Sequence, residues 1–298
     1  MRRPGAATGA WVGAFVVVVG CATNPLAAPP SSFAAADSGA GPVPSANVVA
    51  RPSDAGGRVA VLDALRSVYL GNIAIERKAP GKVGGSVGAT LAIDGELGVG
   101  SEEIERRGLR SVRTAEGVEI ALRGYPTRAD APRARDSAAS FVIDFDTDDV
   151  GNVRAQAARE HGEKPTMRAL TSFVATFVEK KNLARGYDPA SVVARRREGD
   201  CTEHAVLLAA LGRSFGYAAR VVHGMVFVDE KGQLLAGMHA WVEWHDGKTW
   251  SPADAAVGEE HDPLYLPLQM LEDETPAFGR HLILSASQNI RRVALTPR

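Results

Sequence analysis

The sequence has only two cysteines among its 298 residues, Cys21 and Cys201. Cys21 lies in an N-terminal leader, and if it carries lipid, as argued below, no disulfide framework is possible. Exported chains tend to pair their cysteines or to avoid them. The single remaining thiol, that of Cys201, therefore needs an explanation.

An excess of basic residues is also lacking. The chain has 34 lysines and arginines against 35 aspartates and glutamates, which gives a formal net charge of −1. A basic excess is the usual electrostatic signature of nucleic-acid binding, so we expect no nucleic-acid partner. The three consecutive arginines at residues 195–197 are interpreted as a solvated loop or helix end.

No hydrophobic run has the length of a membrane span. Residues 11–19 are apolar, but a spanning helix needs about 20 such residues. With Arg2 and Arg3 before it, this run predicts an export signal over residues 1–20. The run ends in VVGC, which resembles a bacterial lipobox with Val18 in place of the usual leucine. We therefore expect an exported, periplasmic protein held at the membrane by lipid on Cys21, with cleavage near residues 27–28 as the alternative.

The composition divides the rest of the chain into three parts. Residues 21–57 are rich in Ala, Pro, Ser and Gly and predict a flexible tether. Residues 58–145 predict a small β-rich accessory domain of unknown role, in which residues 59–70 fit a helix or a strand equally well. Residues 146–298 form the third part. The strands expected in the accessory domain lie at 86–93, 109–112, 118–122 and 141–145, with a hairpin turn at 114–117.

The third part begins with helical patterns and continues with strands. Apolar residues recur at spacings of three and four after Pro165, which is typical of an amphipathic helix. The pair Asp246 and Gly247 predicts a tight hairpin between two later strands. Helices are expected at 147–160, 165–182 and 201–211, with a short segment at 191–196 leading into the last helix. A break is expected at 212–216, and strands at 219–228, 239–244 and 248–253.

Cys201 opens the most apolar of these helices. Asp200 is a good N-cap, and Glu203 stands at the reciprocal position of a capping box. A helix N-terminus carries about half a positive charge, which favours a thiolate and lowers a cysteine pKa. On this helix alone, a reactive nucleophile and a buried structural cysteine are equally good interpretations.

Two polar residues further along favour the nucleophile. His239 starts one strand, and Asp254 ends the next strand across the tight hairpin. Adjacent strands lie about 4.8 Å apart, so the two side chains can come within hydrogen-bond distance. A cysteine, a histidine and a carboxylate supply a nucleophile, a general base and a group that orients the base.

Four ordered blocks resemble the bacterial transglutaminase-like family: GDCTEH at 199–204, GYAARVV at 216–222, MHAWVE at 238–243 and WSPAD at 250–254. The resemblance covers residues 165–260. It implies an α+β fold with a papain-like transglutaminase core, in which a buried helix bearing the cysteine packs against an antiparallel sheet. It also implies that Cys201, His239 and Asp254 are the catalytic nucleophile, base and orienting residue. Relatives often have V-P-V-D where this chain has Ser251 to Asp254, but the aspartate is kept.

Neighbouring aromatic and histidine residues are interpreted as structural. Trp241, Trp244 and Trp250 are expected to pack in the core and the cleft wall, and His204 and His223 to be structural histidines. The histidines do not have the spacing of a zinc site, so we expect no metal and no cofactor. The Cys201 N–H is the expected oxyanion donor.

The leading hypothesis is a thiol enzyme that acts on amide or peptide bonds of a protein or peptide through a thioester. Transfer of the acyl group to water would make it a hydrolase, and transfer to an amine would make it a transglutaminase. The alternative is a non-catalytic binding or scaffolding module of the cell envelope. Acetyl transfer is a weaker third possibility, because nothing in the sequence indicates a cofactor pocket.

Overall fold

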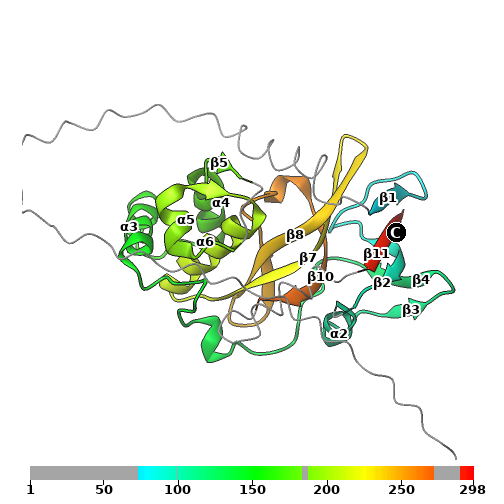
Figure 1. Cartoon of the computed structure of the whole chain (residues 1–298), viewed down its shortest axis with the longest axis horizontal. Coiled ribbons are helices and arrows are strands. Elements are labelled where there is room, and N and C mark those ends of the chain that lie inside the picture. The colour runs from blue at the N-terminus through cyan, green and yellow to red at the C-terminus, as the bar shows by residue number, and fades with distance from the viewer. Residues whose placement is uncertain (1–72, 99, 183–186, 272–288) are drawn as a thin grey trace, which may run out of the picture. The chain divides into compact units, whose positions relative to one another are not determined.

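The computed structural model describes residues 73–98, 100–182, 187–271 and 289–298, all within one compact unit of the chain. The predicted export signal, Cys21, the predicted tether and residues 59–70 lie outside these ranges. In the described part no helix has both the length and the hydropathy needed to cross a bilayer. The fold is mixed α+β, as predicted, with a group of helices beside two β-sheets (Figure 1). The longer helices are α3 (Asp148–His161), α4 (Met167–Phe177), α5 (Ala190–Arg196) and α6 (Cys201–Ser214).

The helix α6 is the centre of this arrangement. It contacts α3, α4 and α5 and also the two longest strands. Every residue from Glu203 to Arg213 is buried, which explains why the helix is apolar on all sides. The break predicted at residues 212–216 is wrong at its start, since α6 continues to Ser214. Gly212 stays helical with Met167 Sδ only 3.3 Å from the position that a Cβ would take.

A four-stranded sheet lies against α6, with strand order β10-β7-β8-β9. Its strands are β7 (Ala218–Glu230), β8 (Gln233–His245), β9 (Trp250–Ala253) and β10 (Leu264–Met270). All neighbours are antiparallel, and β8 pairs with β9 from His245↔Trp250 to Val242↔Ala253. The predicted hairpin at Asp246 and Gly247 is therefore confirmed, and its register carries the chain directly to Asp254.

A five-stranded sheet contains three of the four strands predicted for the accessory region. Its order is β1-β11-β2-β4-β3, so the last strand of the chain lies between the first two. Its hydrophobic core includes residues of the other sheet, among them Met225, Phe227 and Leu266. The proposed division at residue 145 stays a prediction. The strands are β1 (Ala74–Arg77), β2 (Ala89–Glu96), β3 (Ser111–Arg113), β4 (Gly117–Leu122) and β11 (Asn289–Pro297).

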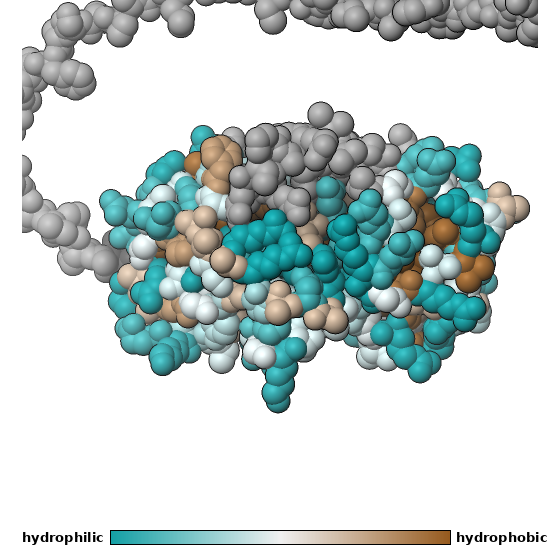
Figure 2. All heavy atoms as spheres, turned by 90° about the horizontal axis from the view of Figure 1, so that it is seen from below, coloured by the Kyte–Doolittle hydropathy of each residue, from teal (hydrophilic) through white to brown (hydrophobic). Residues whose placement is uncertain are grey.

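Some short elements and one correction complete the description. The strand predicted at residues 141–145 is wrong, because this segment is irregular. Phe141 is 70% exposed while Val142 and Ile143 are both buried, so the side chains do not alternate. On the face shown in Figure 2, hydrophobic residues form small separate patches among hydrophilic ones. The short elements are α2 (Gly100–Arg106), β5 (Lys180–Lys181), β6 (Glu198–Gly199) and the 3₁₀ turns Ala134–Asp136 and Glu259–His261.

We predict that truncating a valine in α6 destabilises the protein far more than the same change at the surface. Val206 is fully buried, whereas Val112 is 48% exposed. Val206→Ala should lower the free energy of unfolding by about 2 kcal/mol, because it removes buried methyl groups and leaves a cavity. Val112→Ala should change it by less than about 0.5 kcal/mol. Urea denaturation measures both, and equal losses would contradict the central position of α6.

Candidate active site

The capping box at the start of α6 holds Cys201 in place. Asp200 Oδ1 accepts hydrogen bonds from Thr202 N–H at 2.8 Å and Thr202 Oγ1 at 2.8 Å. Glu203 Oε2 accepts the Asp200 N–H at 3.0 Å, which completes the predicted reciprocal pair. The box confirms the predicted start of the helix. It also fixes the backbone on both sides of the sulfur.

Glu203 links this cap to the preceding loop. Its second oxygen, Oε1, accepts the Asp188 N–H at 3.2 Å, and its side chain is fully buried. Burial, followed by the nearby charge of Asp200, raises the pKa of Glu203 to about 7. The sequence reveals the capping role of Glu203 but not its contact with Asp188, which depends on the path of the loop.

His239 and Asp254 meet as the hairpin predicts. His239 Nε2 lies 2.7 Å from Asp254 Oδ2, and the two residues are 3% and 6% exposed. The imidazole also lies close enough to Cys201 for each group to shift the pKa of the other. Because Asp254 engages Nε2, Nδ1 is the ring nitrogen left to interact with Cys201. The structure thus brings Cys201, His239 and Asp254 together in that order.

Asp254 is held at both of its oxygens. Oδ1 accepts the N–H groups of Ala256 at 2.9 Å and Val257 at 3.1 Å. Oδ2 accepts the Tyr265 hydroxyl at 2.8 Å in addition to His239. Burial raises the pKa of Asp254, but the charge and hydrogen bond of His239 outweigh it and lower the pKa. The carboxylate is therefore ionised and fixed in orientation.

The pKa of Cys201 differs from the sequence-based expectation. Burial raises the pKa of the Cys201 thiol, and attraction to His239 opposes this only in part. The lowered pKa expected from the helix N-terminus is wrong, because the sulfur is almost completely removed from water. For His239, burial lowers the pKa, but the charges of Asp254 and Cys201 raise it to about 10.

Aromatic rings form a wall beside the imidazole. The Trp241 ring stacks on His239 with the centroids 6.2 Å apart. Its Nε1–H donates to the Tyr125 hydroxyl at 2.8 Å, and Tyr125 in turn donates to Glu243 Oε1 at 2.6 Å. Trp241 and Trp250 are buried in the core, as predicted, and Trp244 is half-buried against Tyr217.

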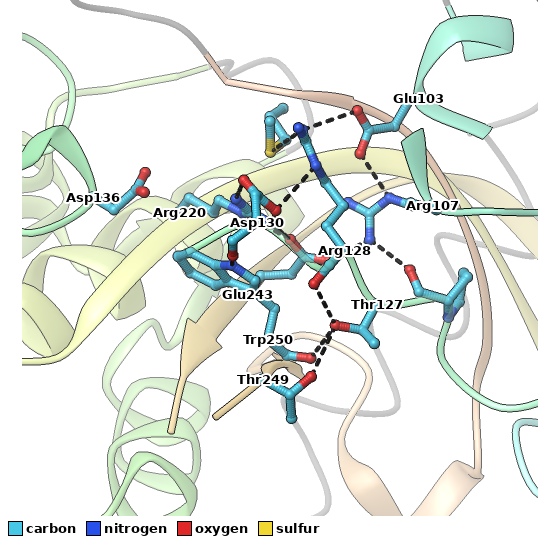
Figure 3. A network of polar contacts seen from close by, with 12 residues as sticks. Glu103, Arg107, Thr127, Arg128, Asp130, Asp136, Arg220, Glu243, Thr249 and Trp250 are labelled. Atoms are coloured by element: carbon cyan, nitrogen blue, oxygen red, sulfur yellow. Dashed lines mark hydrogen bonds and ion pairs between the residues drawn. The ribbon is translucent and has the colours of Figure 1, made fainter. Parts of the chain in front are cut away.

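Through Tyr125 this wall is connected to Glu243, which belongs to a buried network of ion pairs (Figure 3). Glu243 on β8 bonds Arg107 Nη1 at 2.5 Å and Arg220 at 2.8 Å. Arg107 also bonds Glu103 at 2.7 Å, and Arg220 reaches Asp130 at 2.9 Å. Burial raises the pKa of Glu243, but the attraction of Arg107 outweighs it and lowers the pKa. These charges look scattered in the sequence, and only long-range folding gathers them.

His204 and His223, the two histidines interpreted as structural, have these contacts. His204 Nδ1 lies 2.6 Å from the backbone oxygen of Asp200, one turn back in the same helix. The His223 ring lies 5.1 Å from that of Tyr187. Within the described ranges, no three histidine, cysteine or acidic side chains are grouped so that they could hold a metal ion.

A comparison with known protein families matches the part of the chain that carries Cys201, His239 and Asp254. The model of the transglutaminase-like superfamily matches residues 152–255, about a third of the chain. The chain therefore contains a transglutaminase-like domain, whereas β10 and the five-stranded sheet lie outside the matched range. No curated protein matches the chain.

Two solved structures have partial similarity. A candidate cysteine protease from Cytophaga hutchinsonii has a TM-score of 0.34 and 15% identity, covering 53% of this chain and 65% of its own. The periplasmic domain of TgpA from Pseudomonas aeruginosa, bound to ethylmercury, has a TM-score of 0.32 and 19% identity, covering 46% of this chain and 54% of its own. The chain thus spans less than two thirds of either structure.

We predict that His239 lowers the pKa of the Cys201 thiol from the still higher value that burial alone would give. His239→Gln removes the positive charge, so the thiolate fraction and the alkylation rate of Cys201 at pH 8 should fall by about tenfold, the effect of one pKa unit. Iodoacetamide labelling followed by peptide mapping measures the rate. His245→Gln, on the same strand but in contact with Trp250, is the matched control and should leave the rate unchanged. Equal alkylation rates in the two variants would contradict the interaction between His239 and Cys201.

Proposed function

We propose that this chain, whose residues 152–255 form a transglutaminase-like domain, is a thiol enzyme that acts on amide bonds through a thioester on Cys201. The observation that carries the proposal is the buried pair of His239 and Asp254 at the sulfur. Burial of an imidazole and a carboxylate costs free energy unless the two groups are paired. The pairing here has the roles of base and orienting group that a thiol nucleophile needs.

The first half of the reaction forms the thioester. In the reactive state the proton of the Cys201 thiol has moved to His239 Nδ1. The sulfur can then attack as a thiolate. Attack on the amide carbonyl carbon forms the C–S bond. When the C–N bond breaks, the amine leaves with the proton from His239. Asp254 keeps the imidazole oriented with Nδ1 toward the sulfur throughout.

The second half of the reaction consumes the thioester. An acceptor that loses a proton to His239 attacks the same carbon, and the C–S bond breaks to restore the thiol. Water as acceptor gives hydrolysis of a peptide or amide. A primary amine, such as a lysine side chain, gives transamidation. Both outcomes use the same three residues, so we propose the shared thioester chemistry with a protein or peptide as acyl donor.

The start of α6 supplies an oxyanion donor in this proposal. The cap uses the N–H groups of Thr202 and Glu203, while the Cys201 N–H belongs to the first turn, where a helix offers no backbone acceptor. This N–H stands next to the attacking sulfur. A preorganised backbone donor at that point stabilises the charge that develops on the carbonyl oxygen.

The leader extends the proposal to the location of the protein. We propose that the chain is exported to the periplasm and anchored by lipid on Cys21, so that its substrates are proteins or peptides of the cell envelope. Cells fed a palmitate analogue should label the wild-type protein, and Cys21→Ala should lose the label. An unlabelled wild type, or a label that persists in Cys21→Ala, would contradict the anchor.

A non-catalytic envelope module is the second candidate. The observation that favours it is the burial of Cys201, which is only 7% exposed and whose thiol pKa is raised by that burial. A thiol in this state reacts slowly. In that case the domain would bind a partner of the envelope while the three residues serve the fold.

We predict that the wild-type protein changes a mixed library of peptides and primary amides, and that Cys201→Ala does not. Products are identified by mass spectrometry, with and without an added primary amine to separate transamidation from hydrolysis. Cys201→Ser is a second control that keeps a smaller nucleophile. Identical product profiles for wild type and Cys201→Ala would contradict the enzyme and favour the binding module.

A further inference from the structure

A tyrosine outside the matched domain touches the Asp254 carboxylate. Tyr265 is 5% exposed, and its hydroxyl donates to Asp254 Oδ2 at 2.8 Å. The same oxygen accepts the His239 Nε2–H at 2.7 Å. Two donors therefore divide the charge of one carboxylate oxygen, while backbone N–H groups occupy the other oxygen. A change in the tyrosine donor therefore changes how strongly Asp254 Oδ2 attracts the His239 N–H.

The sheet register explains how Tyr265 reaches this position. Tyr265 pairs with Val226, and the neighbouring Gly224 pairs with His239. Side chains alternate along a strand, so Tyr265, His239 and Trp241 project from the same face of the sheet. Gly224 leaves that face open, since a Cβ there would lie 2.8 Å from the Trp241 ring and 2.1 Å from the Leu266 oxygen. The Trp241 ring crosses β7 at this opening and contacts Tyr265.

Two further rings fix the tyrosine. The Trp241 and Tyr265 centroids are 4.7 Å apart, and Tyr125 meets Tyr265 edge to face at 5.8 Å. Tyr125 is in turn held by Glu243 and the buried ion pairs of the region before the matched domain. The tyrosine hydroxyl is therefore held at Asp254 by packing on two sides.

We propose that Tyr265 is a positioning residue. By donating to Asp254 Oδ2, its hydroxyl weakens the hydrogen bond that the same oxygen accepts from His239. This inference rests on the function proposed above, in which His239 must release a proton to the leaving amine. A carboxylate that gives its whole charge to Nε2–H makes the imidazole more basic and Nδ1–H a weaker acid. The hydroxyl of Tyr265 counteracts this effect.

The direct test is the titration of His239 in the Tyr265→Phe variant of the full chain. The seven histidines are labelled with ¹⁵N, and the His239 signals are assigned with His239→Gln. Loss of one hydrogen bond should raise the His239 pKa by about half a unit. Tyr217→Phe is the matched control, because its hydroxyl bonds the Pro165 oxygen and lies away from the three residues. It should leave the titration unchanged.

A second measurement keeps the test valid if Tyr265→Phe does not fold. Growth with 3-fluorotyrosine replaces the five tyrosines and makes each hydroxyl a stronger donor without changing the chain otherwise. The His239 pKa should then fall, in the opposite direction. An unchanged His239 titration in Tyr265→Phe, or in the fluorinated protein if the variant is unfolded, overturns the proposal.

A double variant separates the role in positioning from a general effect on packing. In an Asp254→Asn background, Tyr265→Phe should no longer move the His239 titration, because the shared carboxylate is gone. An equal shift in both backgrounds would overturn the proposal. None of these readouts uses a substrate. If the library experiment finds no reaction while His239 shifts as expected, the proposed function fails and the control of His239 by Tyr265 stands.

Discussion

The hydrogen bond between His239 and Asp254 depends on the register of one hairpin. Side chains alternate along a strand, so a shift of β9 by one residue would turn Asp254 away from the imidazole. The pairing Val242↔Ala253 fixes that register, and Trp241 stacks against the imidazole on the same strand. The capping box of α6 then fixes the backbone at Cys201, whose thiol and the imidazole shift each other's pKa. The site thus lies where two elements meet, the start of α6 and the β8–β9 hairpin, and local contacts define each of them.

Residues beyond the matched domain complete this meeting point. The region before it supplies Arg107 and Tyr125, which engage Glu243 on the strand that also carries His239. Breaking a buried pair by removing one partner typically costs about 3–5 kcal/mol, because the other charge stays buried. The network therefore ties the region before the matched domain to the face of β8 that carries His239. The segment after the matched domain adds Tyr265, so both flanking regions reach the aromatic wall beside His239.

Sequence reasoning was sufficient where the signals are local. Asp200 and Glu203 are three residues apart, and Asp246 with Gly247 marks the turn between His239 and Asp254, so the cap and the hairpin were both predictable. Tyr265 and Arg107 gave no signal, because their positions depend on pairings between strands and segments far apart in the chain. The raised pKa of Cys201 was also missed, since the helix N-terminus is visible in the sequence but the degree of burial is not. Residues 141–145 alternate in sequence, yet tertiary packing buries two neighbours in succession.

In the proposed function, Cys201 forms a thioester with its substrate. The most direct measurement is intact-protein mass spectrometry after an acid quench, with the protein incubated with an activated acyl donor such as a peptide p-nitrophenyl ester, followed by peptide mapping. The account predicts one added acyl group on the peptide that contains Cys201, removed by hydroxylamine and much reduced in His239→Gln. An unmodified Cys201 peptide in the wild type, or equal labelling in His239→Gln, would contradict it.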